Sequence, residues 1–340
     1  PNLTWQTNRA LNVGVDWELY GGRISGSIEY FKSNKTGLLS NDFIAGTTGF
    51  STITRNKGEI ENKGWEFTIN SVNISKPGFR WNTSFNISFI KNQYKALSND
   101  GLLLSAYTDG SPTHVMKVGQ AVGTFWAIPY LGVDPQNGDA LFRSRSGAVV
   151  NAETVQFDDA TFAGKAIPDY YGGINNTFTV GKFDFLVATQ FNVGNKIYNQ
   201  IKATYVNMGW SNEGGLDQIY ANNSVEVLNR WKKSGDVTNI PRASFINQNY
   251  SPYSTLFVEN GSFLRIRTVT AGYTLKPAQS KWVSSLRIYA TVQNLYVFTK
   301  YSGFDPEVSS TGGSDPRVAG FDYAAYPQAR TYMIGFNLGF

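Results

Sequence analysis

The stretch "LNVGVDWELYGGRISGSIEYF", from Leu11 to Phe31, contains two alternating segments joined by a short glycine-rich turn. From Leu11 to Leu19 every second residue is apolar, and the residues between are Asn, Gly, Asp and Glu. From Ile24 to Tyr30, apolar residues and a glycine alternate with Ser, Ser and Glu. A period of two residues places alternate side chains on one face of a β-strand, and "YGGR" suits a tight turn. The stretch therefore predicts an antiparallel hairpin with one apolar and one polar face.

The same alternation recurs along the chain and predicts about nine strands of about ten residues, the length that a tilted strand needs to cross a bilayer. A change of phase after Ile69 predicts a β-bulge near Asn70. Helical periodicity is confined to about 223–232. If the strands span a membrane, the alternating apolar residues face lipid. This prediction names Val13, Val15, Trp17, Phe85, Ile87, Phe336 and Leu338.

The connections between these strands alternate in length. Short turns lie at Gly21, Pro77 and Gly181, with a modest one near Pro277. Between them lie long polar segments at about 33–59, 95–168, 195–261 and 297–325. Outer-membrane barrels have short periplasmic turns and long external loops, whereas soluble sandwiches rarely sort their loops in this way. The fold class predicted is all-β, an antiparallel transmembrane β-barrel.

Composition agrees with this class and excludes several others. Charged residues make up 16% of the 340 residues and aromatic residues 15%, against the roughly 25% charged residues usual in soluble domains. The mean hydropathy is negative, and we find no run of the ~20 apolar residues that a membrane helix requires. A barrel remains compatible, because only alternate residues of its strands face lipid. The net charge of +5 comes from scattered residues, and without a recognition motif it does not predict nucleic-acid binding.

Residues for catalysis or metal binding are scarce. Cysteine is absent and His114 is the single histidine, which we expect in an exposed loop. A Ser-His-Asp apparatus would rest on that residue, and a Cys/His zinc site is excluded by count. In "GVDPQNGDALF", Asp134, Asn137 and Asp139 lack the spacing of a calcium loop, which favours a turn. We therefore predict no enzyme activity, no metal and no cofactor.

Five segments in this order carry a family resemblance: "NKGWEFTI" (62–69), "NRWKKSGDVTNIPR" (229–242), "NGSFLRIRTVTAGYTL" (260–275), "VQNLYVFTKYSGFDPEV" (292–308) and "YPQARTYMIGFNLGF" (326–340). Together they resemble the C-terminal barrel part of the SusC/RagA family of TonB-dependent outer-membrane transporters. The resemblance implies a 22-stranded plugged barrel, to which residues 1–340 would contribute about 9 to 11 strands as one portion. The plug domain, the TonB box and the N-terminal strands would be absent from this chain.

The resemblance implies import of oligosaccharides or peptides across the bacterial outer membrane. The expected partners are a SusD-like surface lipoprotein, the TonB complex through the missing N-terminal part, outer-membrane lipid, and a glycan or peptide substrate. Two alternatives stay open: a passive porin or secretion-system barrel, and a soluble β-rich glycan-binding module whose apolar faces pack between two sheets.

Two sets of site residues follow from this interpretation. The substrate-contact candidates are the external-loop residues Trp210, Trp231, Tyr301, Asp305 and Glu307. The alternative is that Trp231 and the segment from Asp305 to Glu307 brace the loops. The chain ends on alternating aromatic residues, which resemble the C-terminal signal read by the barrel-insertion machinery. Its residues are Gly335, Phe336, Leu338 and Phe340.

Overall fold

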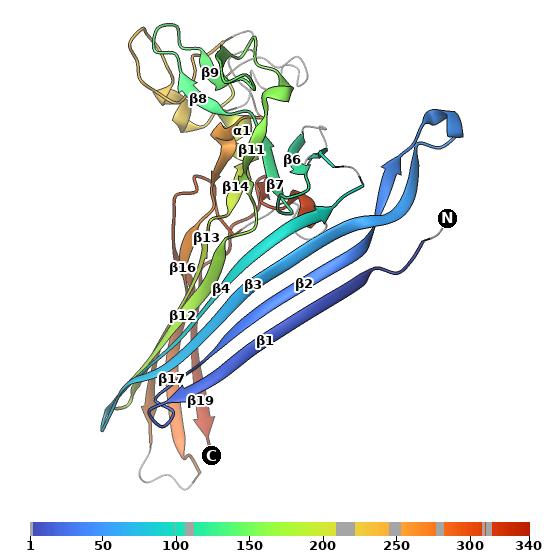
Figure 1. Cartoon of the computed structure of the whole chain (residues 1–340). Coiled ribbons are helices and arrows are strands. Elements are labelled where there is room, and N and C mark those ends of the chain that lie inside the picture. The colour runs from blue at the N-terminus through green and yellow to red at the C-terminus, as the bar shows by residue number, and fades with distance from the viewer. Residues whose placement is uncertain are drawn as a thin grey trace.

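The computed structural model (Figure 1) describes residues 3–98, 100–105, 112–208, 222–244, 253–276, 282–307, 310 and 315–340. Its main element is a nine-stranded antiparallel sheet in which neighbours in space follow chain order. The strands are β1 (Thr7–Leu19), β2 (Ile24–Phe43), β3 (Thr52–Lys76), β4 (Phe79–Ala96), β12 (Tyr170–Val180), β13 (Phe183–Val193), β16 (Phe263–Leu275), β17 (Ser285–Thr299) and β19 (Thr331–Gly339). The predicted antiparallel all-β fold is confirmed.

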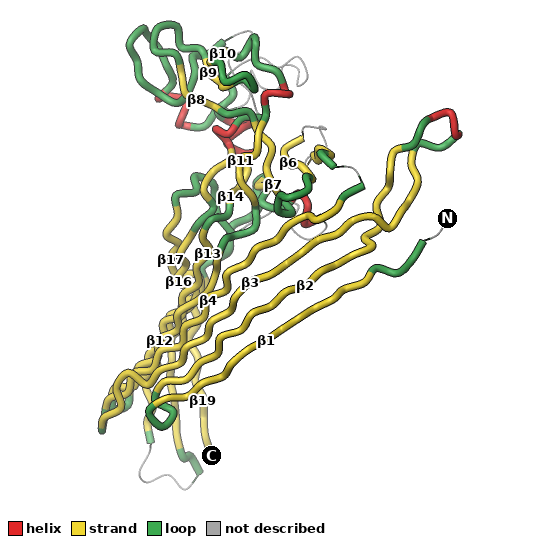
Figure 2. Tube along the Cα trace, viewed as in Figure 1, coloured by secondary structure: helices red, strands yellow, loops and turns green. Residues whose placement is uncertain are grey.

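The sheet curves, so that β17 and β19 lie behind β1 in the view of Figures 1 and 2. The turns between β1 and β2, between β3 and β4 and between β12 and β13 gather at the end of the sheet opposite the loops (Figure 1), and Gly181 N donates to Gly78 O at 2.8 Å, which joins two of them. The turn predicted near Pro277 lies outside the described residues. The predicted long connection at 33–59 is wrong. There β2 and β3 continue as a paired hairpin up to Phe43 and Thr52, with a short 3₁₀ helix, η1 (Gly46–Thr48), near its tip. Of two register shifts in this part of the hairpin, one leaves Gly37, whose φ is +69°, without a partner, and the other leaves Lys57 without one.

The chain segments that connect strands of the large sheet fold into a layer of small sheets. This layer lies at the end of the large sheet opposite the short turns, which we call the loop end. One contains β5 (Leu102–Ser105), β6 (Pro112–Met116), β7 (Thr124–Ala127) and β11 (Thr161–Lys165). A second contains β8 (Tyr130–Val133), β9 (Ala140–Arg143) and β10 (Val149–Asn151). The third contains β14 (Lys196–Asn199), β15 (Val258–Asn260) and β18 (Phe321–Asp322). None of these strands joins the large sheet in the described residues, so its strand count is the lowest in the predicted range.

Helices are short in the part of the chain that the structure describes. The α-helix α1 (Gln200–Tyr205) is capped at its N-terminus by Asn199, whose side chain accepts from Lys202 N. The 3₁₀ helices η2 (Phe157–Asp159), η3 (Val225–Asn229), η5 (Thr255–Phe257) and η6 (Pro316–Val318) complete the set. The helical periodicity at 223–232 therefore corresponds to η3 alone, and α1 was not predicted. Among the described residues, no helix is long and apolar enough to cross a membrane.

The closely packed core lies in the loop layer rather than in the large sheet. Phe125, Tyr198, Phe257 and Phe321 are almost fully buried and form one cluster with α1. A second cluster surrounds Phe142 on β9. These aromatic side chains come from segments far apart in the sequence, and their burial holds the loop layer together.

The large sheet has two chemically different faces. The face that carries Val13, Val15 and their cross-strand partners is called the outer face. The face that carries Asn12 and Asp16 is called the inner face. Val13, Val15, Phe336 and Leu338 are 58%, 64%, 73% and 42% exposed. Trp17, Phe85 and Ile87 belong to the same face by register and are half-buried. The register shift between Val72 and Ile74 confirms a bulge in β3, but places it at Asn73 rather than near Asn70.

Candidate functional site

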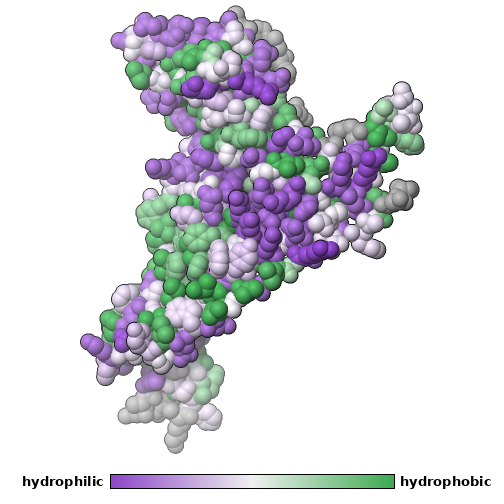
Figure 3. All heavy atoms as spheres, in the orientation of Figure 1, coloured by the Kyte–Doolittle hydropathy of each residue, from purple (hydrophilic) through white to green (hydrophobic). Residues whose placement is uncertain are grey.

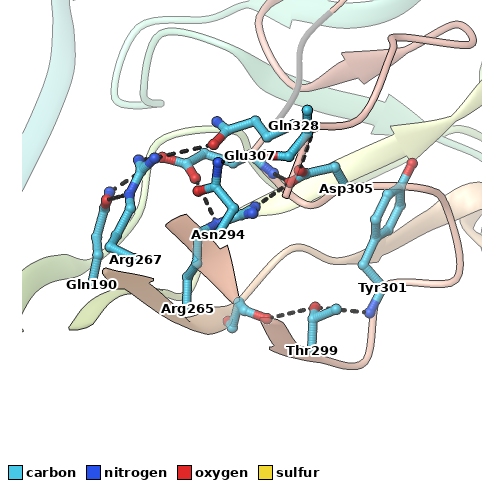
Figure 4. A network of polar contacts seen from close by, with 11 residues as sticks. Gln190, Arg265, Arg267, Asn294, Thr299, Tyr301, Asp305, Glu307 and Gln328 are labelled. Atoms are coloured by element: carbon cyan, nitrogen blue, oxygen red, sulfur yellow. Dashed lines mark hydrogen bonds and ion pairs between the residues drawn. The ribbon is translucent and has the colours of Figure 1, made fainter. Parts of the chain in front are cut away.

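Two arginines on β16 form the base of a polar network on the inner face (Figure 4). Arg265 lies opposite Gln190 of β13, and the register shifts between Ile266 and Thr268. This bulge leaves Arg267 without a ladder partner, and a residue two positions along a strand returns to the same face. Arg267 Nε donates to Gln190 Oε1 at 2.6 Å. The two guanidinium groups are therefore presented side by side.

Two carboxylates from the segment after β17 bind these arginines. Arg265 NH2 lies 2.5 Å from Asp305 Oδ1, and both side chains are 5% exposed. Arg267 NH2 lies 2.5 Å from Glu307 Oε1. Arg265 Nε also lies 3.0 Å from Glu307 Oε2, as an ion pair without hydrogen-bond geometry. Charge-assisted pairs of this kind, held in a site of low exposure, fix geometry strongly.

The Asp305 carboxylate also accepts hydrogen bonds from the backbone of the loop. Glu307 N donates to Asp305 Oδ1 at 2.9 Å, and Gln328 N donates to Asp305 Oδ2 at 3.3 Å. Arg267 NH1 donates to Gln328 Oε1 at 3.1 Å. The network thus connects the loop before β19 to strands β13 and β16. We call this network the clamp. It holds the loop in place and takes no part in proton transfer, because the arginines keep their charge at any physiological pH.

Tyr301 lies beside this clamp at the end of β17. Its backbone N donates to Thr299 Oγ1 at 3.1 Å, and its hydroxyl donates to Asp322 Oδ2 at 2.6 Å. Burial, followed by the hydrogen bond to Asp322, raises the pKa of the Tyr301 hydroxyl. The neutral hydroxyl therefore remains a hydrogen-bond donor throughout the physiological range.

Trp231 occupies a different place, in the loop layer. Its Nε1 donates to Pro135 O at 3.0 Å, and its ring lies against Gly138, where an added Cβ would come within 2.4 Å of it. Asp134 and Asn137 accept from backbone N–H groups two residues along the chain, as the predicted turn requires. The structure thus joins Asp305 and Glu307 through the two arginines, places Tyr301 nearby with a bond to Asp322 (Figure 4), and holds Trp231 apart from them. Trp210 lies outside the described residues.

A cavity of about 750 Å³ lies between the extended β2–β3 hairpin and η6. Tyr94 and Arg317 line it. The Tyr94 side chain is almost fully buried, and its hydroxyl has no hydrogen-bond partner among the described residues. The Asp315 carboxylate beside Arg317 has a lowered pKa, chiefly because it accepts hydrogen bonds from that guanidinium.

The C-terminal strand β19 pairs with β17 along its whole length. Phe336 and Leu338 lie on the outer face, opposite Ile288 and Leu286, and Phe340 lies beyond the strand end. Gly335 lies on the inner face, where an added Cβ would come within 2.5 Å of the Tyr289 ring. A larger residue at 335 would therefore require the Tyr289 ring to shift.

The expectation of an exposed His114 is wrong. His114 lies on β6, is fully buried, and contacts the Phe125 ring at 4.5 Å between centroids. Its Nδ1 and Nε2 lie 2.8 Å from Thr113 Oγ1 and 2.9 Å from Ala319 O. Since a carbonyl only accepts, Nε2 carries the proton. Desolvation by burial lowers the pKa of His114 to about 4, so the ring is neutral at physiological pH.

Sequence reasoning did not identify Gln190, Arg265 and Arg267. The alternation in "FLRIRTVT" placed both arginines on the polar face, and that signal could have found them. Within the described ranges, no group of three or more His, Cys, Asp or Glu residues is arranged to hold a metal ion.

Comparisons with known proteins agree with this architecture. No protein-family model matches the chain. The TonB-dependent receptor P3 of Formosa agariphila is 30% identical over 366 residues, which cover 100% of this chain and 34% of the receptor. The TonB-dependent receptor SusC of Bacteroides thetaiotaomicron is 30% identical over 360 residues, covering 100% of this chain and 32% of SusC. The chain thus spans about a third of the length of these relatives.

The fold also matches a solved structure. A chain of the RagAB peptide transporter superposes with a TM-score of 0.82 and 21% sequence identity, covering 99% of this chain and 36% of that chain. The matched relatives are named as receptors and transporters, not as enzymes. The homologues of this chain are therefore TonB-dependent receptors, SusC among them, and its fold is that of part of a RagAB transporter chain.

Proposed function

We propose that residues 1–340 are the C-terminal portion of the β-barrel of a SusC/RagA-type transporter in the bacterial outer membrane. The observation that carries this proposal is the nine-stranded sheet with an apolar outer face and a polar inner face. In the described residues, β1 and β19 each pair along one edge only. Unpaired backbone edges are very costly in hydrocarbon. The remaining strands of a 22-stranded barrel, the plug and the TonB box belong to sequence outside this chain.

The activity proposed is TonB-dependent import of oligosaccharides or peptides together with a SusD-like surface lipoprotein. The names of the relatives support both substrate classes, since SusC is a TonB-dependent receptor and RagAB a peptide transporter. The polar inner face, with Arg265 and Arg267 clamped by carboxylates, suits the wall of a hydrated lumen. We propose that Gly335, Phe336, Leu338 and Phe340 serve as the insertion signal of this barrel.

Growth of a host strain tests this function. The full-length gene is deleted and then restored with or without its TonB box, and growth is measured on single oligosaccharides and on peptide mixtures. We expect growth on one class to require both the gene and the TonB box. Uptake that persists without the TonB box would favour the passive porin.

Membrane fractionation distinguishes the proposed transporter from the remaining alternative, the soluble glycan-binding module. The full-length protein should pellet with outer membranes and require detergent for extraction. A protein soluble without detergent would favour the glycan-binding module. The exposures of Val13 and Val15, 58% and 64%, support the membrane location, because neither side chain packs between two sheets.

The growth and uptake assay also tests whether the candidate residues contact the substrate. Trp231, Asp305 and Glu307 each contact other parts of this chain, which favours a bracing role over direct substrate contact. Replacement of Trp231 by Phe removes the Nε1 donor to Pro135 and part of the ring that packs against Gly138, while an aromatic ring is retained. If the side chain braces the loop, import affinity stays unchanged; a substrate contact predicts weaker import at low substrate concentration.

A further inference from the structure

A row of lysines crosses the outer face of three adjacent strands. Lys32 of β2 lies directly opposite Lys63 of β3, and Lys63 lies directly opposite Lys91 of β4. We call these three residues the lysine row. Like charges placed opposite each other on neighbouring strands destabilise a sheet. An anion bound between these ammonium groups would reduce the repulsion.

An aromatic row lies two residues away along each strand, on the same face. It consists of Tyr30, Trp65, Phe89 and Tyr170, which are direct cross-strand neighbours. The ring centroids of Tyr30 and Trp65 are 5.1 Å apart, and those of Phe89 and Tyr170 are 5.5 Å apart. Two residues of strand correspond to roughly 7 Å. Rows of aromatic residues mark the level of lipid headgroups on membrane barrels.

The single carboxylate among these lysines neutralises them only in part. Glu61 is almost fully buried and lies 3.0, 3.2 and 3.4 Å from the ammonium groups of Lys32, Lys63 and Lys95. Those three lysine side chains are still 44%, 37% and 39% exposed. By register, this part of the outer face carries Arg9, Lys32, Lys63 and Lys91 together with Glu59 and Glu61. Lys95, whose ammonium group contacts Glu61, adds a fifth cation, so five cations against two carboxylates leave three positive charges.

We propose that the lysine row binds phosphate groups of glycolipid headgroups in the outer leaflet of the membrane. The row lies toward the loop end of the strands, beyond the aromatic row, and Figure 3 shows hydrophilic atoms gathered above a band of hydrophobic ones on this part of the sheet. Long lysine stems lie along apolar surface while their ammonium groups reach the headgroup level. The inference rests on the proposed outer-membrane location and concerns a surface that the import function does not use.

Binding is tested with the purified full-length protein in detergent micelles, titrated with lipid A and with lipid A dephosphorylated by a phosphatase. Native mass spectrometry counts the bound lipids. We expect the wild type to prefer the phosphorylated form. The variant Lys32→Gln/Lys63→Gln/Lys91→Gln should bind it on the order of tenfold or more weakly, because each lysine contributes to attraction by an anionic headgroup. Added salt should weaken wild-type binding.

A matched control removes three lysines from the opposite end of the barrel: Lys76→Gln/Lys182→Gln/Lys276→Gln. It changes the net charge equally and should leave lipid A binding unchanged. Lys91→Gln alone provides a second test, because Lys91 is not among the lysines that contact Glu61, so the substitution leaves those ion pairs intact. We expect it to weaken binding severalfold.

Three results would overturn the inference: equal affinity for phosphorylated and dephosphorylated lipid A, equal loss in the control triple variant, or no loss in both the lysine-row triple variant and Lys91→Gln. Import is measured separately in the same variants. If import fails in the wild type while phosphate selectivity holds, the transport proposal is wrong and the lipid site stands. A protein absent from outer membranes would contradict both proposals, because the lipid site rests on that location.

Discussion

Removal of the Asp305 carboxylate should release the loop before β19 from the barrel wall. In Asp305→Ala, Arg265 NH2, Glu307 N and Gln328 N lose the acceptors that lie 2.5, 2.9 and 3.3 Å away. Breaking a buried ion pair costs about 3–5 kcal/mol. Glu307 Oε2 remains 3.0 Å from Arg265 Nε, so one counter-charge is retained. We therefore expect a loss near the lower limit, about 3 kcal/mol.

Hydrogen exchange followed by mass spectrometry measures this loss where it occurs. A local loss of about 3 kcal/mol raises the population of the open loop about a hundredfold. In the full-length protein, amides in 301–307 and 326–330 should exchange faster by about that factor, while the strands β1 to β4 keep their protection. Asp305→Asn retains an acceptor for Glu307 N and should show a smaller increase.

Lys117→Gln is the control. It removes an ion pair with Asp100 whose side chains are 44% and 39% exposed, and such exposed pairs contribute about 0–1 kcal/mol. Its exchange in 301–307 should equal that of the wild type. Unchanged protection at 305–307 and 328 in Asp305→Ala would refute the clamp, as would a uniform increase over the whole chain.

Three further predictions follow from the faces of the sheet and from the buried histidine. Phe336→Arg on the outer face should lower barrel stability in lipid vesicles by about 2–4 kcal/mol near the bilayer centre, and Met333→Arg on the inner face should cost less; equal urea-unfolding losses would contradict the assignment of the faces. Gly335→Ala should destabilise by about 1–3 kcal/mol through overlap with Tyr289, and Tyr289→Ala in the same chain should restore stability; absence of rescue would exclude this cause. The pKa of His114 falls to about 4 from 6.5, so the unfolded chain binds the proton first and stability is lost as the pH falls from about 6.5 to about 4. His114→Gln should reduce this loss in a thermal-unfolding series, and an unchanged pH profile would contradict it.

The sequence by itself determined the strands and their two faces. Alternation is a local property, because successive side chains of a strand point to opposite sides whatever the strand packs against. For this reason the hairpin at Leu11–Phe31, the presence of a bulge in β3 and the nine strands of the large sheet were all predictable. The turn at Asp134 was predictable as well, since Asx side chains bond to their own backbone two residues on.

Tertiary structure decided whatever depends on distant segments. The hairpin of β2 and β3 extends through 33–59, because cross-strand pairing continues where the sequence alone reads as polar loop. His114 is buried because Ala319, 205 residues away in sequence, caps its ring. Arg265 meets Asp305 across 40 residues, and a bulge turns Arg267 to the same side. Contacts between segments so far apart depend on the register and curvature of the whole sheet, and a local pattern carries no information about either.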